Sequence, residues 1–200
     1  MNSLKQDQLK YGKSAAFHEA AHYILCIAQE IPVRELGLRI DSKGNGRSHI
    51  YCRESGKEIK SEIDKQEIEK SIVSLFAGYL GQLKFFPELK DMRDVADAAI
   101  KEDLNQIDAL LSDMYPNKPE GWYKAKGILQ TESDRLIKSN WSAIKALANA
   151  LWDQPWKPQV QVPPIDTGWS DDKKEKSMNA RDVAAILREF GLSPIIRADV

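Results

Sequence analysis

The chain has few of the residues that mark several classes of protein. Only two of its 200 residues are cysteines, which is too few for a disulfide scaffold. No apolar run approaches the roughly 20 residues of a membrane helix, and the polar start MNSLKQDQLKYGKS lacks the apolar core of a secretory signal. Lysine and arginine number 29 against 30 acidic residues, so no strong field attracts nucleic acid or anionic lipid. We therefore expect a reduced cytoplasmic protein with no membrane span and no nucleic-acid partner.

The patterns that are present predict a mainly α-helical protein with a small β-hairpin, an α+β fold. Apolar residues make up 42% of the chain, enough for a sizeable core. Apolar spacing predicts helices over 14–30, with Ser14 as N-cap, and over 64–86, 94–114, 121–152 (one long helix or a bent pair) and 180–190. Strands over 33–40 and 47–52 flank a Gly-Asn-Gly turn.

The expected domain organisation has three parts. Residues 1–151 form the core, and 152–178, rich in proline and tryptophan, form a loop or linker. Residues 179–200 form a C-terminal helix and tail docked on the same domain, with Asn179 as N-cap and Gly191 after the helix.

Two of the three histidines, His18 and His22, lie four residues apart in the first expected helix, and Glu19 follows His18. Residues four apart share a helix face, so both imidazoles can point at one ion. Glu19 is turned away by about 100°, which lets it reach a water at that ion without ligating it. This H-E-x-x-H spacing is typical of zinc hydrolases in which the glutamate is the general base. The alternative is a pair of structural histidines satisfied by hydrogen bonds.

A zinc hydrolase needs a third protein ligand. The extended motif that ends in a third histidine fails, because Leu25 and Ala28 occupy its glycine and histidine positions. His49, on the second expected strand, is one possible ligand. On the same strand, Arg47, His49 and Tyr51 are candidate donors to an oxyanion by position alone, and the alternative is that each is an ordinary hairpin residue.

Asp103 is the better candidate for the third ligand. It lies between Ile100 and Ile107 on the face of the 94–114 helix that we expect to be buried. A carboxylate that points inward needs a partner, and a metal ion is one. Asp97 and Asp108, on the flank of that face, remain rivals, as does a surface or capping role for Asp103.

Together these segments resemble the peptidase domain of the FtsH-type membrane-anchored AAA proteases. The family has H-E-A-G-H where this chain has HEAAH, and LFAGYLGQL at 75–83 is similar to its L-x-G-G-R-x-A-E-E helix. The segment EDL, which contains Asp103, resembles the family's N-D-[LI] segment, which supplies its third zinc ligand. The likeness covers about residues 13–151 and implies a zincin-like helix in a helical domain. It implies zinc held by His18, His22 and Asp103.

Two departures from the family pattern matter. Gln82 and Leu83 replace the family's glutamate pair, although Gln82 still offers a carbonyl oxygen that can accept a bond from a zinc-ligating histidine. No counterpart of the ATPase module or of the transmembrane span is found, so the resemblance implies the peptidase part standing alone.

The expected function is a zinc-dependent, ATP-independent metallopeptidase that cleaves flexible or unfolded polypeptides, with Glu19 as general base. An extended peptide is expected to add to the edge of the 47–52 strand. The alternative is a metal-binding but inactive homologue that serves as an interaction or regulatory module. Association with a separate partner protein is left open for either function.

Overall fold

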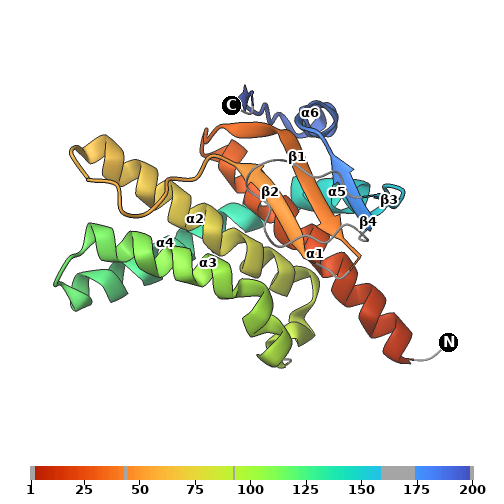
Figure 1. Ribbon diagram of the computed structural model, residues 1–200, viewed down its shortest axis with the longest axis horizontal. Helices are drawn as coiled ribbons and strands as arrows, with labels where there is room; N and C mark the ends of the chain where they lie inside the picture. The colour runs from red at the N-terminus through yellow and green to blue at the C-terminus, as the bar shows by residue number, and fades with distance from the viewer. Residues whose placement is uncertain (1–2, 43–44, 92, 159–173, 199–200) are drawn as a thin grey trace.

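The computed structural model describes residues 3–42, 45–91, 93–158 and 174–198, with the side chains of 3–11, 93–99 and 119 not described. The fold is mainly helical with one small sheet, as the sequence predicts (Figure 1). In chain order the elements are α1 (Ser3–Ala28), β1 (Val33–Asp41), β2 (Gly46–Ile50), α2 (Glu62–Phe85), η1 (Pro87–Asp91), α3 (Arg93–Met114), α4 (Pro119–Ser139), α5 (Trp141–Trp152), β3 (Lys157–Pro158), β4 (Lys174–Met178), α6 (Ala180–Leu187), η2 (Arg188–Phe190) and β5 (Ile196–Arg197).

Helix α1 lies at the centre of the molecule. Helices α2 and α5 pack against it, and β1 and β2 also contact it. Its residues from Ser14 to Ile27 are all buried, rather than only the apolar stripe that the sequence pattern predicts. A helix enclosed on all sides needs small or apolar residues around its whole circumference, which the alanines at 15, 16, 20 and 21 provide.

Both ends of α1 differ from the prediction. The helix begins at Ser3, so Ser14 is an interior residue instead of the N-cap; the one glycine in this first part, Gly12, does not interrupt the helix. The C-terminal end is a Schellman motif, in which Ile31 N donates to the Cys26 carbonyl at 2.8 Å and Glu30 N donates to that of Ile27 at 3.0 Å. Glu30 takes the left-handed conformation at φ 60° in this motif.

The sheet has the order β2-β1-β4-β3, with these neighbours antiparallel, and β5 pairs in parallel with the start of β1. The predicted hairpin is therefore confirmed. Its ladder shifts register between Val33 and Leu38, where Gly37 lies at φ +69° against the Met178 carbonyl. Only glycine fits there, because a Cβ would overlap that oxygen.

The segment 152–178, predicted to be a loop or linker, contains two strands at its described ends. β4 pairs with β1 and β3 with β4, so this part of the chain completes the sheet. Lys176 fixes β4 to the end of α5, because its ammonium lies over the rings of Trp152 and Trp156 and donates to the Trp152 carbonyl. Residues 159–173 lie outside the described residues.

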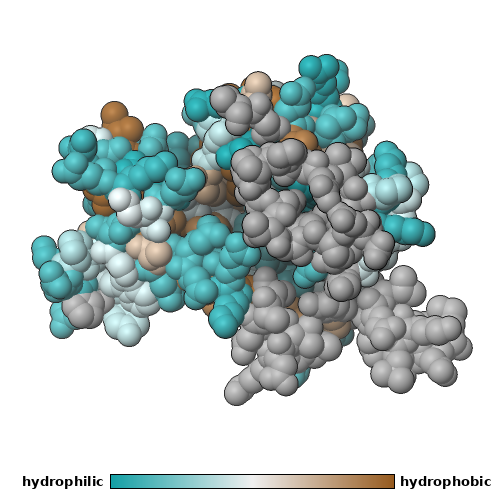
Figure 2. Space-filling model, viewed as in Figure 1, coloured by the Kyte–Doolittle hydropathy of each residue, from teal (hydrophilic) through white to brown (hydrophobic). Residues whose placement is uncertain are grey.

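The remaining helices follow the sequence pattern closely. The 121–152 region is the bent pair, α4 and α5, joined at Asn140. Asn179 caps α6 through its side chain, and Gly191 closes η2 at φ 69°. No helix within the described ranges is long and apolar enough to cross a membrane. On the face in Figure 2, the described surface is mostly hydrophilic, with small separate hydrophobic patches.

Candidate metal centre

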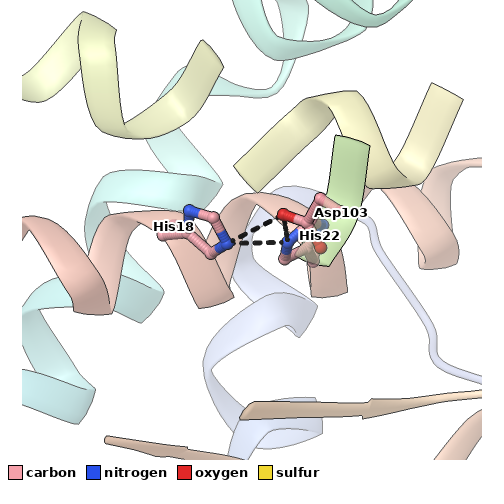
Figure 3. Close-up of side chains that lie close together, drawn as sticks. All are labelled: His18, His22 and Asp103. Atoms are coloured by element: carbon pink, nitrogen blue, oxygen red, sulfur yellow. Dashed lines mark hydrogen bonds and ion pairs between the residues drawn. The ribbon is translucent and has the colours of Figure 1, made fainter. Parts of the chain in front are cut away.

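Three side chains from two helices converge on one point. His18 and His22 project from the same face of α1, and Asp103 reaches them from α3 (Figure 3). The two Nε2 atoms lie 3.0 Å apart, and Asp103 Oδ2 lies 3.2 Å from each. The histidines are buried and Asp103 is largely so. The structure thus brings together the three residues that the sequence analysis proposed as ligands.

Each imidazole is held from behind by a hydrogen-bond acceptor. His22 Nδ1 donates to the Ser74 carbonyl of α2 at 2.6 Å, and a carbonyl can only accept, so the proton of the neutral ring lies on Nδ1. His18 Nδ1 lies 3.3 Å from Gln82 Oε1, while Gln82 Nε2 donates to Ser14 Oγ at 2.9 Å. The expectation that Gln82 accepts through its carbonyl is therefore confirmed. In both neutral rings the lone pair of Nε2 faces the centre of the triangle.

This donor set fits a bound divalent metal ion. Two nitrogen lone pairs and a carboxylate oxygen face one another with no proton between them when both rings are neutral, which is unfavourable unless a cation lies there. A tetrahedral zinc ion with bonds of about 2.0–2.1 Å holds its ligand atoms roughly 3.3–3.4 Å apart. The observed separations of 3.0–3.2 Å are close to that spacing.

The electrostatics of the cluster favour a positive charge at the same point. Burial lowers the pKa of His22, but the charge and hydrogen bond of Asp103, followed by Glu19, outweigh it and raise this pKa to about 10. Burial opposes ionisation of Asp103, yet the neighbouring His22 and His18 hold the pKa of this carboxyl well below its usual range. Without a metal ion, a proton on the histidine pair supplies that charge, and a metal ion that bound there would displace it.

Glu19 lies beside His18, His22 and Asp103 without belonging to their cluster. Its Oε1 is 4.0 Å from His18 Nε2, and its side chain is buried. The start of β2 covers it: a Cβ on Gly46 would lie 2.4 Å from both Glu19 Cγ and Glu19 Oε1. Gly46 therefore makes room for the carboxylate, a role that the sequence analysis missed because this glycine was assigned only to the turn.

Gly78 of α2 lies directly against the Nε2 atoms of the two histidines. A Cβ there would lie 2.3 Å from His22 Nε2 and 2.6 Å from His18 Nε2. Gly81, one turn later, meets Ala21 in the same way, with 2.5 Å between the added Cβ and the Cβ of Ala21. The two glycines therefore allow a close contact between α1 and α2, and Gly78 is the one that faces the histidines.

Two rival candidates for the third ligand, Asp108 and His49, have partners outside the cluster. Asp108 pairs with Lys126 at 2.6 Å, and the side chain of Asp97 lies outside the described residues. His49 accepts a bond from Arg39 at 3.0 Å, which takes it out of the candidate ligand set.

The candidate oxyanion donors Arg47, His49 and Tyr51 do not point at the three clustered side chains. Successive strand residues face opposite sides, and Gly46 faces Glu19, so Arg47 and His49 face away from the metal centre. The hydroxyl of Tyr51 donates to the Ala198 carbonyl near the C-terminus.

Comparison with known proteins leaves the geometry as the basis for assigning a function. No protein-family model matches this chain, and no curated protein is significantly similar to it in sequence.

Proposed function

We propose that this protein is a zinc-dependent peptidase that cleaves flexible or unfolded polypeptides. The observation that carries the proposal is the convergence of His18, His22 and Asp103 with the Glu19 carboxylate 4.0 Å from one ligand nitrogen. Two imidazoles and one carboxylate form a ligand set that zinc hydrolases use, with the fourth position left for water or substrate.

The buried Glu19 carboxylate beside the three proposed ligands favours zinc over other metals. Two histidines and one carboxylate also hold ferrous iron in oxygenases. Those reactions need no general base, whereas a buried glutamate beside the ligands is what hydrolysis requires. Bound zinc supplies a Lewis acid that acidifies a water molecule and polarises a carbonyl group.

The residues of the chain supply the remaining chemistry. Ser74 and Gln82 fix the orientation of the two imidazoles, so little reorganisation is needed when the site acts. Glu19 Oε1 takes a proton from the attacking water and then passes it to the leaving amine. Burial beneath Gly46 keeps that carboxylate in place next to the ligands.

An extended peptide is the substrate that suits the neighbouring strand. β2 is an outer strand of the sheet, and its second side pairs with no other strand in the described part of the chain. A peptide that adds to this edge by backbone hydrogen bonds must be extended, which a folded protein does not offer. Because the start of β2 covers Glu19, a peptide on this edge passes close to the general base.

The resemblance to the FtsH-type peptidase domain supports the same proposal. The helix that carries the third ligand and the glycine-containing helix behind the histidines follow the motif helix in the order that the resemblance implies. Gln82 takes the supporting role expected of a carboxylate in that family, as a neutral acceptor.

The experiment is proteolysis of fluorescently labelled casein, a flexible protein, by the zinc-loaded chain and by Glu19→Gln. Loss of the general base is expected to lower the rate by about 10²–10⁴-fold while one zinc per chain remains bound. Glu102→Gln is the matched control, because Glu102 is exposed next to Asp103 and its loss leaves the rate unchanged.

The inactive-homologue alternative predicts a different result. In that case wild type and Glu19→Gln both bind zinc, and neither degrades casein above the rate of a His22→Ala variant. Wild-type activity that does not require zinc would also contradict the proposal, as would equal activity in wild type and Glu19→Gln.

A further inference from the structure

The two cysteines of the chain, 26 residues apart in sequence, are brought together by backbone hydrogen bonds. The Schellman motif of α1 folds Ile31 back onto the Cys26 carbonyl at 2.8 Å. The next residue, Pro32, accepts a bond from Tyr51 N at 3.1 Å, which extends the β1–β2 ladder by one step. Cys52, which follows Tyr51, is therefore placed over the end of α1.

Helix α2 fixes Cys52 in that position. Arg53 N donates to Ser71 Oγ at 3.0 Å, and the Arg53 guanidinium pairs with Asp64 at 2.9 Å. Cys52 packs against the buried core cluster that contains Cys26, and each thiol shifts the pKa of the other, with Ser74 beside Cys26 and Ser71 beside Cys52. Both cysteines are free thiols.

The two thiols differ in access to solvent. Cys26 is fully buried at 0% exposure, whereas Cys52 is partly exposed. Interaction with Cys26 lowers the pKa of Cys52 against the opposing effect of burial, and burial raises the pKa of Cys26. A small oxidant therefore meets Cys52 first, and the buried thiol of Cys26 is the group next to it.

We propose that Cys26 and Cys52 are a peroxide-reactive pair that forms an intramolecular disulfide. The thiolate of Cys52 attacks one oxygen of hydrogen peroxide, the O–O bond breaks, and hydroxide leaves and takes up the thiol proton as water. Cys26 Sγ then attacks the Cys52 sulfenic acid; an S–S bond forms, the S–O bond breaks, and the second water carries the Cys26 proton. Two thiols lose two electrons in total, and one peroxide is reduced to two waters.

The disulfide ties α1 to the connection between β2 and α2. Cys26 lies one helical turn after His22, so the bond fixes the helix that carries the metal ligands to the segment that follows the edge strand. The pair forms a modification site separate from the metal centre, because neither sulfur belongs to the ligand cluster. The inference does not depend on the proposed peptidase function.

The test treats the full chain with hydrogen peroxide, blocks free thiols with N-ethylmaleimide under denaturing conditions, and measures intact mass and tryptic peptides without reductant. The expected result is loss of two hydrogens, no maleimide on either thiol, and peptide 14–34 joined to peptide 48–53. In Cys26→Ser, Cys52 stops at sulfenic acid and is trapped by a cyclic 1,3-diketone. In Cys52→Ser, the buried Cys26 stays reduced at the same dose and takes up maleimide.

Three outcomes would overturn the inference, and each can be read on wild type even if the variants fold poorly. They are a sulfinic or sulfonic acid on Cys52 with Cys26 still labelled, a disulfide between two chains, and full labelling of both thiols after peroxide treatment. Casein hydrolysis is not used as a readout, so failure of the peptidase proposal leaves this test unaffected.

Discussion

Replacing Gly78 by alanine is expected to remove the metal ion while the fold remains. The added Cβ would lie 2.3 and 2.6 Å from the Nε2 atoms of His22 and His18, about 1 Å short of an ordinary contact. Zinc bonds of about 2.0–2.1 Å do not survive a displacement of that size.

The expected loss of zinc affinity in Gly78→Ala is large, whereas the expected loss of folding stability is moderate. Changes behind a metal ligand already cost about 10–100-fold in affinity, so displacement of two ligand nitrogens is expected to cost more than about 100-fold. Overpacking destabilises by about 1–3 kcal/mol, against which alanine gains about 0.5–1 kcal/mol over glycine inside a helix. The metal-free Gly78→Ala protein is thus expected to remain folded with at most a moderate loss of stability.

Gly81→Ala is the matched control, because its Cβ presses on Ala21 of the same helix pair, at 2.5 Å, and meets no histidine. The assay is zinc titration against a chromophoric chelator, together with thermal unfolding of the metal-free proteins. Gly81→Ala should lose stability but bind zinc nearly as wild type does. Equal zinc affinity in Gly78→Ala and wild type, or equal loss in the two variants, would refute the steric argument.

Four further changes have defined outcomes. Gln82→Leu should lower zinc affinity by about 10–100-fold, with Gln82→Glu retaining it, in the same titration. Calorimetry in buffers of different ionisation enthalpy should show about one proton released per zinc at pH 7, because Asp103 outweighs burial and raises the pKa of His22 to about 10. Burial and the neighbouring arginines lower the pKa of His49 to about 3. The free energy of unfolding should therefore fall as the pH drops from about 6.5 towards 3, by at most about 1.4 kcal/mol per pH unit. Urea unfolding of His49→Gln should lack this part of the pH dependence. Gly127→Ala, in α4 with open space around it, should raise the free energy of unfolding by about 0.5–1 kcal/mol.

Local patterns predicted the helices well because their signals lie within each segment. Asn179, whose side chain accepts two backbone N–H groups, and Gly191 mark the ends of the last helical segment in both sequence and structure. The N-terminal part of α1 was missed because Ser14 is a good N-cap residue, yet its hydroxyl accepts from Gln82 instead. A partner 68 positions away is not visible in a local pattern.

The larger errors of the sequence-based prediction concern strands that pair with distant parts of the chain. β4 forms its ladder with β1 across more than 130 positions, and its sequence KEKSM looks like a solvated charged run until the sheet is known. The face of His49 was also not predictable, because a shift of one residue in register reverses which side chains point at α1.

The clustering of the three proposed metal ligands was accessible to sequence reasoning for a simple reason. His18 and His22 need only the period of one helix, and Asp103 needs only an inward position on another. Gly46 and Gly78 needed the packing of β2 and α2 on α1, which no spacing within either segment reveals.

X-ray absorption at the zinc edge of the zinc-loaded protein tests the central claim most directly. We expect one zinc per chain with nitrogen and oxygen neighbours at about 2.0–2.1 Å, two of them imidazoles, and loss of this spectrum in His22→Ala and Asp103→Ala. A sulfur neighbour at about 2.3 Å would assign the metal to the cysteines instead. That result, or a protein that binds no zinc, would contradict the site formed by His18, His22 and Asp103.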